Sequence, residues 1–476
     1  MKSVRLFLVN VGLRTFSNFW VVPPMGVLSL AAYLRQKFPL EIRVVNQRLE
    51  NFTADEIARQ AADFGADIIG LSVLTTTACL LPEMTSKMRA ALPNAFIVLG
   101  GPHVSSSGGL ALEGIDADAA VSGEGERPFE MLLRAKFEGD GDLGAVPGLI
   151  WRDKDGTVVQ NAGEPLFVED LDTLPMPAYD LINLPAYWRR QTIVPMIYRR
   201  YAALVTSRGC PFHCIWCHNI FGKRIRHHSP ERIVEEMTLL NRQYGVKDFE
   251  MLDDTFNYHG RHVIEFCELL QRRNLKFKWA LPNGVRGDLL TREVIDAVAD
   301  AGMYMCMFAL ESGSPRIQQY TQKNLNIPRF LENCKMVAAR RIFISSCCML
   351  GFPTETEEEL RQTIDMACEA DFHTSSFFIV TPYPGTPLYD IVKRDHPEKL
   401  EKIDFGMANS TTVRVNLTDL PDEVLYGYQR QAARRFFLNP RRIARIVRDH
   451  PQRLALPAYL PMFCYRALMG AAGGSH

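Results

Sequence analysis

Three cysteines lie close together on one short stretch of the chain, between Ser207 and Asn219. Cys210, Cys214 and Cys217 follow the spacing C-x3-C-x2-C, which lets three thiolates surround one compact metal centre. A structural zinc site needs four ligands, so three thiols do not complete one. Three thiolates suit a cubane iron–sulfur cluster whose fourth iron stays open to a small molecule. The alternatives are a zinc knuckle with a distant fourth ligand and three unrelated thiols.

Length and composition indicate a globular protein of several domains. With 476 residues the chain is too long for one ordinary core, and ~150 residues per domain suggests two to four units. Its 54 basic and 54 acidic side chains cancel, so no global field points to nucleic acid. No stretch reaches the ~18 uninterrupted apolar residues of a membrane span. Eleven cysteines without regular pairing favour a reducing compartment, by default the cytoplasm.

Residues 1–135 alternate short apolar runs with amphipathic stretches. The runs predict strands at 4–11, 41–45, 67–73, 95–99 and 119–122, with helices at 26–37, 54–64, 82–91 and 128–136. This order predicts an α/β domain with a doubly wound, Rossmann-like parallel sheet. Residues 136–198 read as a connector that contains a hairpin at 148–159 around an Asp-Gly turn.

Residues 199–390 return to the same alternation. Strands are expected at 203–206, 248–252, 278–281, 305–310, 342–350 and 376–381, with helices between them, including 230–244, 259–273 and 291–301. Six strand–helix units predict a partial barrel whose site lies at the carboxyl ends of the strands.

The last segment, residues 391–476, is predicted to be helical and contains two unusual runs. Residues 434–448 are rich in arginine, and residues 454–469 are apolar. A basic amphipathic helix can lie on a membrane surface. The alternative is a helix that caps the barrel and keeps its arginines in solvent.

Glycines and hydroxyl groups follow the strands of the first sheet. Ligands of such sheets bind beyond the carboxyl ends of the strands, where glycine lets the backbone approach a bulky molecule. The residues expected to bind a cofactor there are Ser72, Thr75, Thr76, Gly100, Gly101, Gly123, Glu124, Gly125 and Glu126. A generic flavodoxin-like fold would also explain the glycines.

These motifs stand ahead of the cysteine loop, in which Trp216 precedes the last cysteine. In this order they resemble the cobalamin-dependent radical S-adenosylmethionine (SAM) enzymes over about residues 1–390. The resemblance implies that SAM binds the open iron of a 4Fe–4S cluster and that residues 1–135 bind cobalamin. It also implies base-off cobalamin, because the Asp-x-His-x-x-Gly box is absent and His103 stands in another context.

The same resemblance suggests residues that contact SAM at the second and third barrel strands. Asp253 and Asp254 follow the second strand, and either can receive the amino group of SAM. The alternative for Asp254 is a helix N-cap. Asn283 and Arg286 end the third strand, where the planar fork of arginine suits a carboxylate. A surface ion pair competes with that role.

Glu311 and Ser312 end the fourth barrel strand. By resemblance to similar enzymes, the carboxylate of Glu311 accepts both ribose hydroxyls of SAM. The alternative is a carboxylate that caps the next helix. No catalytic residue beyond the cofactor ligands is singled out.

The resemblance implies a methyltransferase acting on an unactivated carbon of a hydrophobic or natural-product-type small molecule, lipid-like or polycyclic. A deoxyadenosyl radical would abstract hydrogen, methylcobalamin would donate the methyl group, and a second SAM would restore it. An external donor of flavodoxin or ferredoxin type would supply electrons. Two alternatives stay open: ring closure, as in the anaerobic porphyrin-ester cyclase, and a catalytically silent protein that binds cobalamin and SAM.

Overall fold

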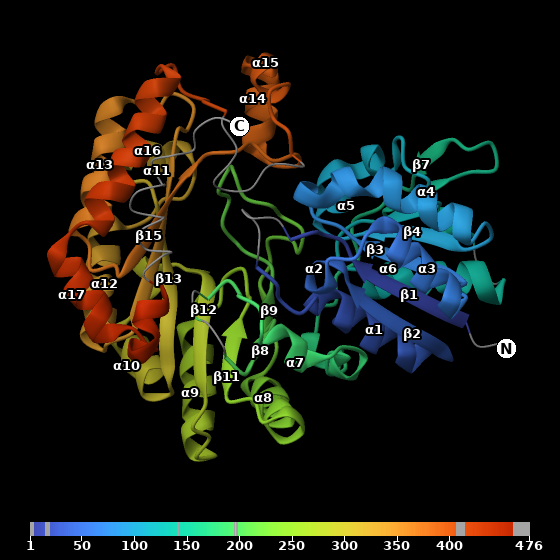
Figure 1. Ribbon diagram of the computed structural model, residues 1–476, viewed down its shortest axis with the longest axis horizontal. Coiled ribbons are helices and arrows are strands. Elements are labelled where there is room, and N and C mark those ends of the chain that lie inside the picture. Colours follow the sequence, from blue (N-terminus) through green and yellow to red (C-terminus); the bar gives the residue numbers. More distant parts are fainter. Residues whose placement is uncertain are drawn as a thin grey trace.

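The computed structural model describes residues 4–14, 20–139, 142–194, 196, 199–405 and 415–459. Two α/β bodies lie side by side, and the helices between residues 422 and 449 lie on the far side of the second body (Figure 1). No helix among these residues is both long enough and apolar enough to cross a membrane.

The first body contains a seven-stranded sheet in the order β2-β1-β3-β4-β5-β6-β7. Its first five strands are parallel, as the alternation predicts. Their bounds are Val4–Asn10 (β1), Leu40–Asn46 (β2), Ile68–Ser72 (β3), Phe96–Gly100 (β4) and Ala119–Val121 (β5). Asn46, Asn10, Ser72 and Gly100 are in register across four strands, so they form one row at the carboxyl edge.

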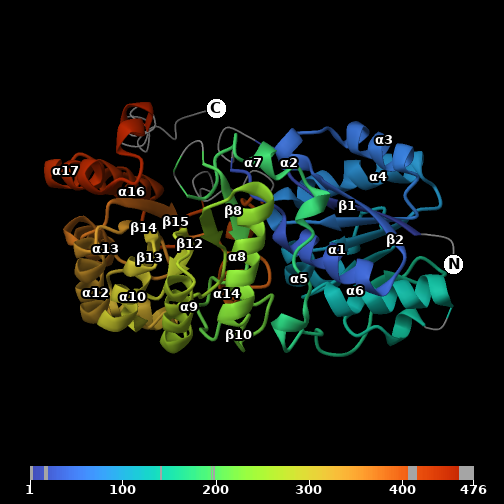
Figure 2. The ribbon, with the colours of Figure 1, turned by 90° about the horizontal axis from the view of Figure 1, so that it is seen from below.

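Helices cover both faces of this sheet, which confirms the doubly wound fold (Figure 2). On one face lie α1 (Met25–Lys37) and α6 (Glu126–Leu133); on the other lie α3 (Ala54–Phe64), α4 (Leu81–Ala91) and α5 (Pro102–Ser107). A capping box at Thr53 begins α3, and Gly65 ends it in the left-handed conformation. The short helix α2 (Gln47–Glu50) follows β2, and the short helix α7 (Leu184–Tyr187) precedes the first strand of the second body.

The hairpin expected in the connector extends the first sheet. Strand β6 (Leu149–Arg152) pairs antiparallel with β5, and β7 (Val158–Gln160) pairs with β6. The first sheet therefore continues beyond residue 135, because the unpaired edge of β5 offers a row of backbone groups to the hairpin. A hairpin is a local signal, and the sequence does not say which edge it joins.

The second body is a six-stranded, fully parallel open barrel in the order β15-β14-β13-β12-β11-β8. This confirms the six strand–helix units. The strands are Tyr201–Leu204 (β8), Asp248–Met251 (β11), Lys278–Val285 (β12), Met303–Glu311 (β13), Phe343–Leu350 (β14) and Thr374–Ile379 (β15). A two-stranded ribbon, β9 (Ser207–Arg208) with β10 (Arg226–His227), follows β8.

Except for α11, whose Ile317 belongs to a smaller apolar cluster, the barrel helices pack their apolar sides onto these strands in one large core. They are α8 (Pro230–Tyr244), α9 (Gly260–Arg272), α10 (Arg292–Asp300), α11 (Pro315–Tyr320), α12 (Ile327–Ala339) and α13 (Glu357–Glu369). Ser229 caps α8 and Gly245 ends it, which matches the predicted bounds of that helix.

The last segment is helical where it is described, as expected. It contains α14 (Pro387–Asp395), α15 (Pro397–Leu400), α16 (Asp422–Phe437) and α17 (Pro440–Asp449). Of the apolar run at 454–469, residues 460–469 lie outside the described residues.

Candidate functional site

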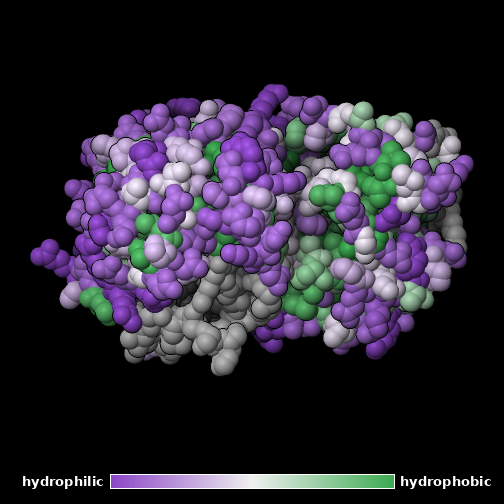
Figure 3. Space-filling view, turned by 90° about the horizontal axis from the view of Figure 1, so that it is seen from above, coloured by the Kyte–Doolittle hydropathy of each residue, from purple (hydrophilic) through white to green (hydrophobic). Residues whose placement is uncertain are grey.

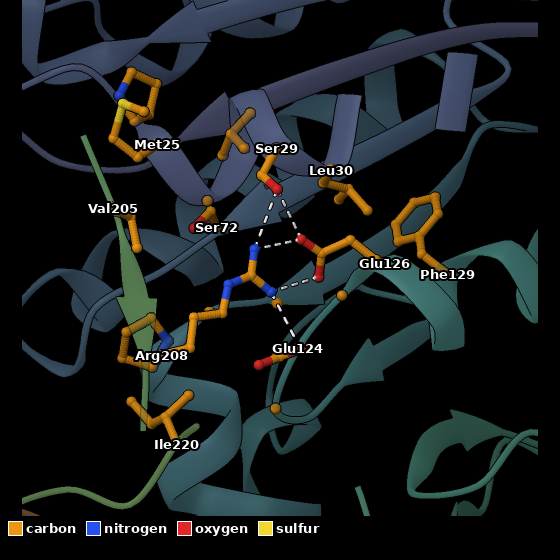
Figure 4. Close-up of a pocket in the computed structure, with 18 of the residues that line it drawn as sticks. Met25, Ser29, Leu30, Ser72, Glu124, Glu126, Phe129, Val205, Arg208 and Ile220 are labelled. Atoms are coloured by element: carbon orange, nitrogen blue, oxygen red, sulfur yellow. Dashed lines mark hydrogen bonds and ion pairs between the residues drawn. The ribbon is translucent and has the colours of Figure 1, made fainter. Parts of the chain in front are cut away.

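A cavity of about 520 Å³ lies where the carboxyl edge of the first sheet meets loops of the barrel. The sheet side is lined by small residues at the strand ends: Ser72, Gly100, Gly101, Gly123 and Gly125. Barrel residues, among them Val205, Arg208, His218, Ile220, Phe221 and Asp254, close the opposite side (Figure 4). The space-filling view shows a hollow between the two bodies, with hydrophobic residues beside it (Figure 3).

Gly101 shows why the edge of the sheet needs glycine. Its φ is +89°, and an added Cβ would lie 2.8 Å from the nitrogen of Val73. Glycine therefore lets the backbone after β4 lie directly against the backbone after β3, and this junction lines the cavity. Small residues at the strand ends let a large planar ligand such as a corrin approach the backbone of this edge.

The three cysteines lie on the loop between β9 and β10. Gly209 begins this loop at φ +92°, and a Cβ there would meet the carbonyl oxygen of Arg224 at 2.3 Å. The amide of Cys210 donates to Gly222, and the hydroxyl of Thr255 lies 3.2 Å from the Cys210 sulfur. The hydrogen bond between Cys210 and Gly222 thus joins the two ends of the loop. Because Thr255 follows β11, the contact with its hydroxyl places the loop beside the end of that strand.

The donor set fits an iron–sulfur cluster better than a single ion. Cys210, Cys214 and Cys217 are free thiols and are not fully buried. No three His, Cys, Asp or Glu side chains in the described part of the chain converge as one bound ion requires. In a cubane cluster each thiolate binds a different iron, so the three sulfurs stay apart.

Glu311 lies at the end of β13 beside the cysteine loop. Its φ is +61°, an uncommon conformation for a residue other than glycine, and a register shift precedes it. The Lys323 ammonium lies 3.4 Å from Oε1 of Glu311, and the Cys347 sulfur lies 3.7 Å from both carboxylate oxygens. Lys323 also lies 5.9 Å from the centre of the Trp216 ring. A buried anion and cation therefore stand together next to the cysteines.

Lys323 is a site residue that the sequence analysis missed. Burial would lower the pKa of its amine, but Glu311 beside it holds the pKa above its usual value. In the sequence it stands between Gln322 and Asn324 with no motif around it. Only the turn after α11 brings it back to the end of β13.

The two adjacent aspartates have different surroundings. Both carboxylate oxygens of Asp253 accept hydrogen bonds from Thr206, one from its amide and one from its hydroxyl. Burial raises the pKa of Asp253 to about 6. Asp254 instead lines the cavity, with the His218 Nε2 atom 3.8 Å from its Oδ1. Asp253 thus joins two strand ends, and Asp254 remains accessible to a ligand.

Arg286 uses its planar fork within the protein. Its Nε and Nη2 atoms donate to the two oxygens of Asp288 at 3.0 and 2.8 Å, and Nη1 donates to the carbonyl of Lys323. The guanidinium also lies 4.0 Å from the ring centre of Phe212, on the cysteine loop. Arg286 therefore holds the Lys323 segment and the loop in place, and its fork does not face the cavity.

Four further residues predicted to bind a cofactor, Asn283, Ser312, Thr75 and Thr76, do not line the cavity. The Asn283 amide donates to the carbonyl of Leu252, which ties β12 to β11. Ser312 is buried and bonds to Thr363 and Ser314. Thr75 and Thr76 lie on a short 3-10 turn and are not among the residues that line the cavity.

Glu124 and Glu126 bind arginines of the barrel. Arg208 pairs with Glu126 at 2.7 Å and with Glu124 at 3.2 Å, while Arg226 pairs with Glu124 at 2.6 Å. Ser29 donates to Glu126 at 2.8 Å (Figure 4). Burial alone would raise the pKa of Glu126, but Arg208 holds it below its usual value. The four charged side chains are at most 10% exposed, and they lock the two bodies together.

Comparisons with known proteins agree with this arrangement. A family model described as the B12 binding domain matches residues 20–133, and one described as the radical SAM superfamily matches residues 204–367. An uncharacterized methyltransferase of Pyrococcus horikoshii is 30% identical over 90% of each chain. The cytidylyl-2-hydroxyethylphosphonate methyltransferase of Streptomyces wedmorensis is 26% identical over 77% of each chain. The anaerobic magnesium-protoporphyrin IX monomethyl ester cyclase of Rubrivivax gelatinosus is 26% identical over 88% of this chain and 74% of its own.

Solved structures share the fold. The radical SAM methyltransferase TsrM of Kitasatospora setae, with cobalamin and a 4Fe–4S cluster bound, has a TM-score of 0.69 at 19% identity, over 82% of this chain and 78% of its own. The cobalamin-dependent radical enzyme OxsB has a TM-score of 0.72 at 18% identity, over 98% of this chain and 72% of its own.

The chain belongs to the radical SAM superfamily, in the branch that carries a cobalamin-binding domain. Within that branch it is a methyltransferase with three cofactors, a 4Fe–4S cluster, SAM and cobalamin.

The paired charges at the junction give a stability prediction. Glu126→Gln leaves the buried Arg208 with a weaker set of partners, so we expect a loss of about 3 kcal/mol in the free energy of unfolding. Urea unfolding measures it. Glu169→Gln is the matched control, because it breaks the exposed pair between Glu169 and Arg224 of the cysteine loop and costs less than about 1 kcal/mol. Equal losses in the two variants would contradict the structural role of the buried pair.

Proposed function

We propose that this enzyme methylates an unactivated carbon of a hydrophobic or polycyclic small molecule. One observation carries the proposal: the sheet edge that suits cobalamin and the loop that carries the cysteines share one cavity. Arg208, which directly precedes Gly209 and Cys210, and Asp254 both line it. When bound, the cluster supplies the electron that cleaves SAM, and cobalamin supplies the methyl group. Cofactors held in a common chamber can act on the same carbon without diffusion between steps.

The residues around the cysteine loop suggest how SAM is held. Cys210, Cys214 and Cys217 would bind three irons, and Asp254 would accept the amino group of SAM. Glu311 would accept the ribose hydroxyls, as its position at the end of β13 allows. Lys323, and not Arg286, is the cation left for the SAM carboxylate, because Asp288 occupies the fork of Arg286.

The sheet edge supports base-off cobalamin with no histidine on cobalt. Ser72, Gly100, Gly101, Gly123 and Gly125 would contact the corrin. The histidines that line the cavity, His218 and His228, both come from the barrel. His103 lies on α5 and bonds to Ser107, and it is not among the lining residues.

The apolar part of the lining supports a hydrophobic substrate. Leu30, Phe129, Val205, Ile220 and Phe221 line the cavity between the polar groups. Such walls exclude water, which protects a carbon radical from side reactions. An external electron donor of flavodoxin or ferredoxin type would reduce the cluster, whose Cys217 is exposed.

The second candidate function is ring closure. The similarity to an anaerobic cyclase, 26% identical over 88% of this chain, favours it, and no residue of the site separates the two reactions. The products separate them, because only methyl transfer through cobalamin consumes SAM as a methyl donor.

The cluster prediction uses the three cysteines together. Replacing Cys210, Cys214 and Cys217 by alanine should abolish both the broad visible absorbance of anaerobically reconstituted protein and the formation of 5′-deoxyadenosine, because no thiolate is left for iron. Cys79→Ala, at an exposed cysteine of the first body, should change neither. Undiminished SAM cleavage by the triple variant would disprove the ligand assignment.

The second prediction separates the two candidate cations. Lys323→Met should weaken SAM binding about 10- to 100-fold, because a hydrogen bond to a charged group contributes about 1.5–3 kcal/mol. Titration calorimetry on reconstituted protein of equal iron content measures it. Lys335→Met, at an exposed lysine of α12, is the control and should leave SAM affinity unchanged. Unchanged SAM affinity in the Lys323 variant would show that another residue binds the SAM carboxylate.

The third prediction concerns the products. Methyl transfer through cobalamin should yield both 5′-deoxyadenosine and S-adenosylhomocysteine, because SAM is cleaved once as a radical source and once as a methyl donor. Chromatography with mass detection counts both products for each methylated molecule. 5′-Deoxyadenosine without matching S-adenosylhomocysteine would indicate cyclisation, and the absence of both would indicate a silent binding protein.

A further inference from the structure

The end of the described chain carries a concentration of positive charge. Residues 430–453 contain eight arginines and one acidic residue, Asp449, although the whole chain has equal numbers of basic and acidic groups. Arg435 and Arg445 pair with acidic residues of the barrel helices and their loops, and Arg448 pairs with Asp449. For Arg430, Arg434, Arg441 and Arg453 the described residues supply no ion pair. The segment therefore presents a net positive surface.

Exposed aliphatic side chains occur in the same place. Among the described residues nine large hydrophobic side chains are exposed, and four of them lie between 438 and 454. Leu438 is 60% exposed, Ile443 47%, Val447 53% and Leu454 fully. A soluble surface rarely gathers aliphatic groups in this way unless something covers them.

Helix α17 has two different sides. Its inner side contains Arg442, Ile446 and Asp449, and the Arg442 guanidinium donates to backbone carbonyls of Phe372 and Cys368. Side chains three and four positions apart share a helix face, so Ile443 and Val447 lie together on the outer side. Arg441 and Arg448 are exposed on the same outer half.

We propose that this outer side of α17, with Leu438 and Leu454, is a contact surface for a lipid bilayer that contains anionic lipid. Aliphatic groups would enter the boundary between headgroups and acyl chains, and arginines would reach the phosphates. The chain continues into residues 454–469, which contain a single charged residue, Arg466. A protein partner fits less well, because protein interfaces centre on Trp, Tyr and Arg and no exposed aromatic residue belongs to this group.

The contact surface lies away from the cavity. Arg442 binds carbonyls at residues 367–372, which precede β15 and so lie at the amino ends of the barrel strands. The cysteine loop and Glu311 lie at the carboxyl ends. In Figures 1 and 2, α17 lies at the edge of the molecule that is remote from the first body. A bound membrane would therefore leave the site open to its electron donor. This inference does not depend on the reaction proposed above.

Sedimentation of the full-length protein with vesicles tests the surface. Vesicles of phosphatidylcholine with phosphatidylglycerol should bind the protein, and vesicles of phosphatidylcholine alone should bind it at least about tenfold more weakly. Added salt should release it, since the attraction is screened. Arg441→Gln with Arg448→Gln, and separately Ile443→Ser with Val447→Ser, should each weaken binding about tenfold or more.

Leu110→Ser is the matched control, because Leu110 is 65% exposed on the first body, far in sequence from α17. It should bind vesicles like the parent protein, and equal SAM cleavage would show that all variants are folded. No binding to anionic vesicles at low salt would overturn the proposal. It would leave an acidic protein as the alternative partner of this surface. Binding that survives both double variants would also overturn the proposal.

Discussion

Four buried charges join the two halves of this protein, and they fix how the glycine-rich edge of the first sheet faces the cysteine loop. Arg208 and Arg226 come from the ribbon that carries the cysteine loop, and Glu124 and Glu126 come from the edge of the first sheet. Charges taken out of water are costly unless each one finds a partner. Separating the halves would leave four such groups in need of water. The network therefore fixes one relative placement, whereas an apolar contact would allow several.

That placement explains the cavity. Arg208 pairs with Glu126, at the start of α6, directly ahead of Gly209 and Cys210, so the cysteine loop cannot move far from the glycine-rich sheet edge. Beyond the loop, Glu311 and Lys323 pair inside the barrel end, and Arg286 fastens the segment that contains Lys323. One chain of contacts thus runs from the sheet edge to the position proposed for SAM. Apolar side chains line the cavity between them.

Local sequence signals predicted the elements well. Helix α3 has the predicted bounds because a capping box and a glycine mark its ends, and α8 is marked by Ser229 and Gly245. The parallel order of the strands followed from their alternation with helices. The hairpin of β6 and β7 was predicted from its turn, but its union with β5 was not, since pairing with a distant edge leaves no local pattern.

The sequence by itself determined the class of the protein: the spacing of Cys210, Cys214 and Cys217 and the order of the glycine motifs are properties of the chain alone. Only the tertiary structure decided what each charged residue does. Glu124, Glu126 and Asp253 are engaged within the protein, and Lys323 becomes the cation beside Glu311. The reason is physical. A motif records spacing along the chain, whereas the role of a buried charge depends on partners that folding brings from far away in the sequence.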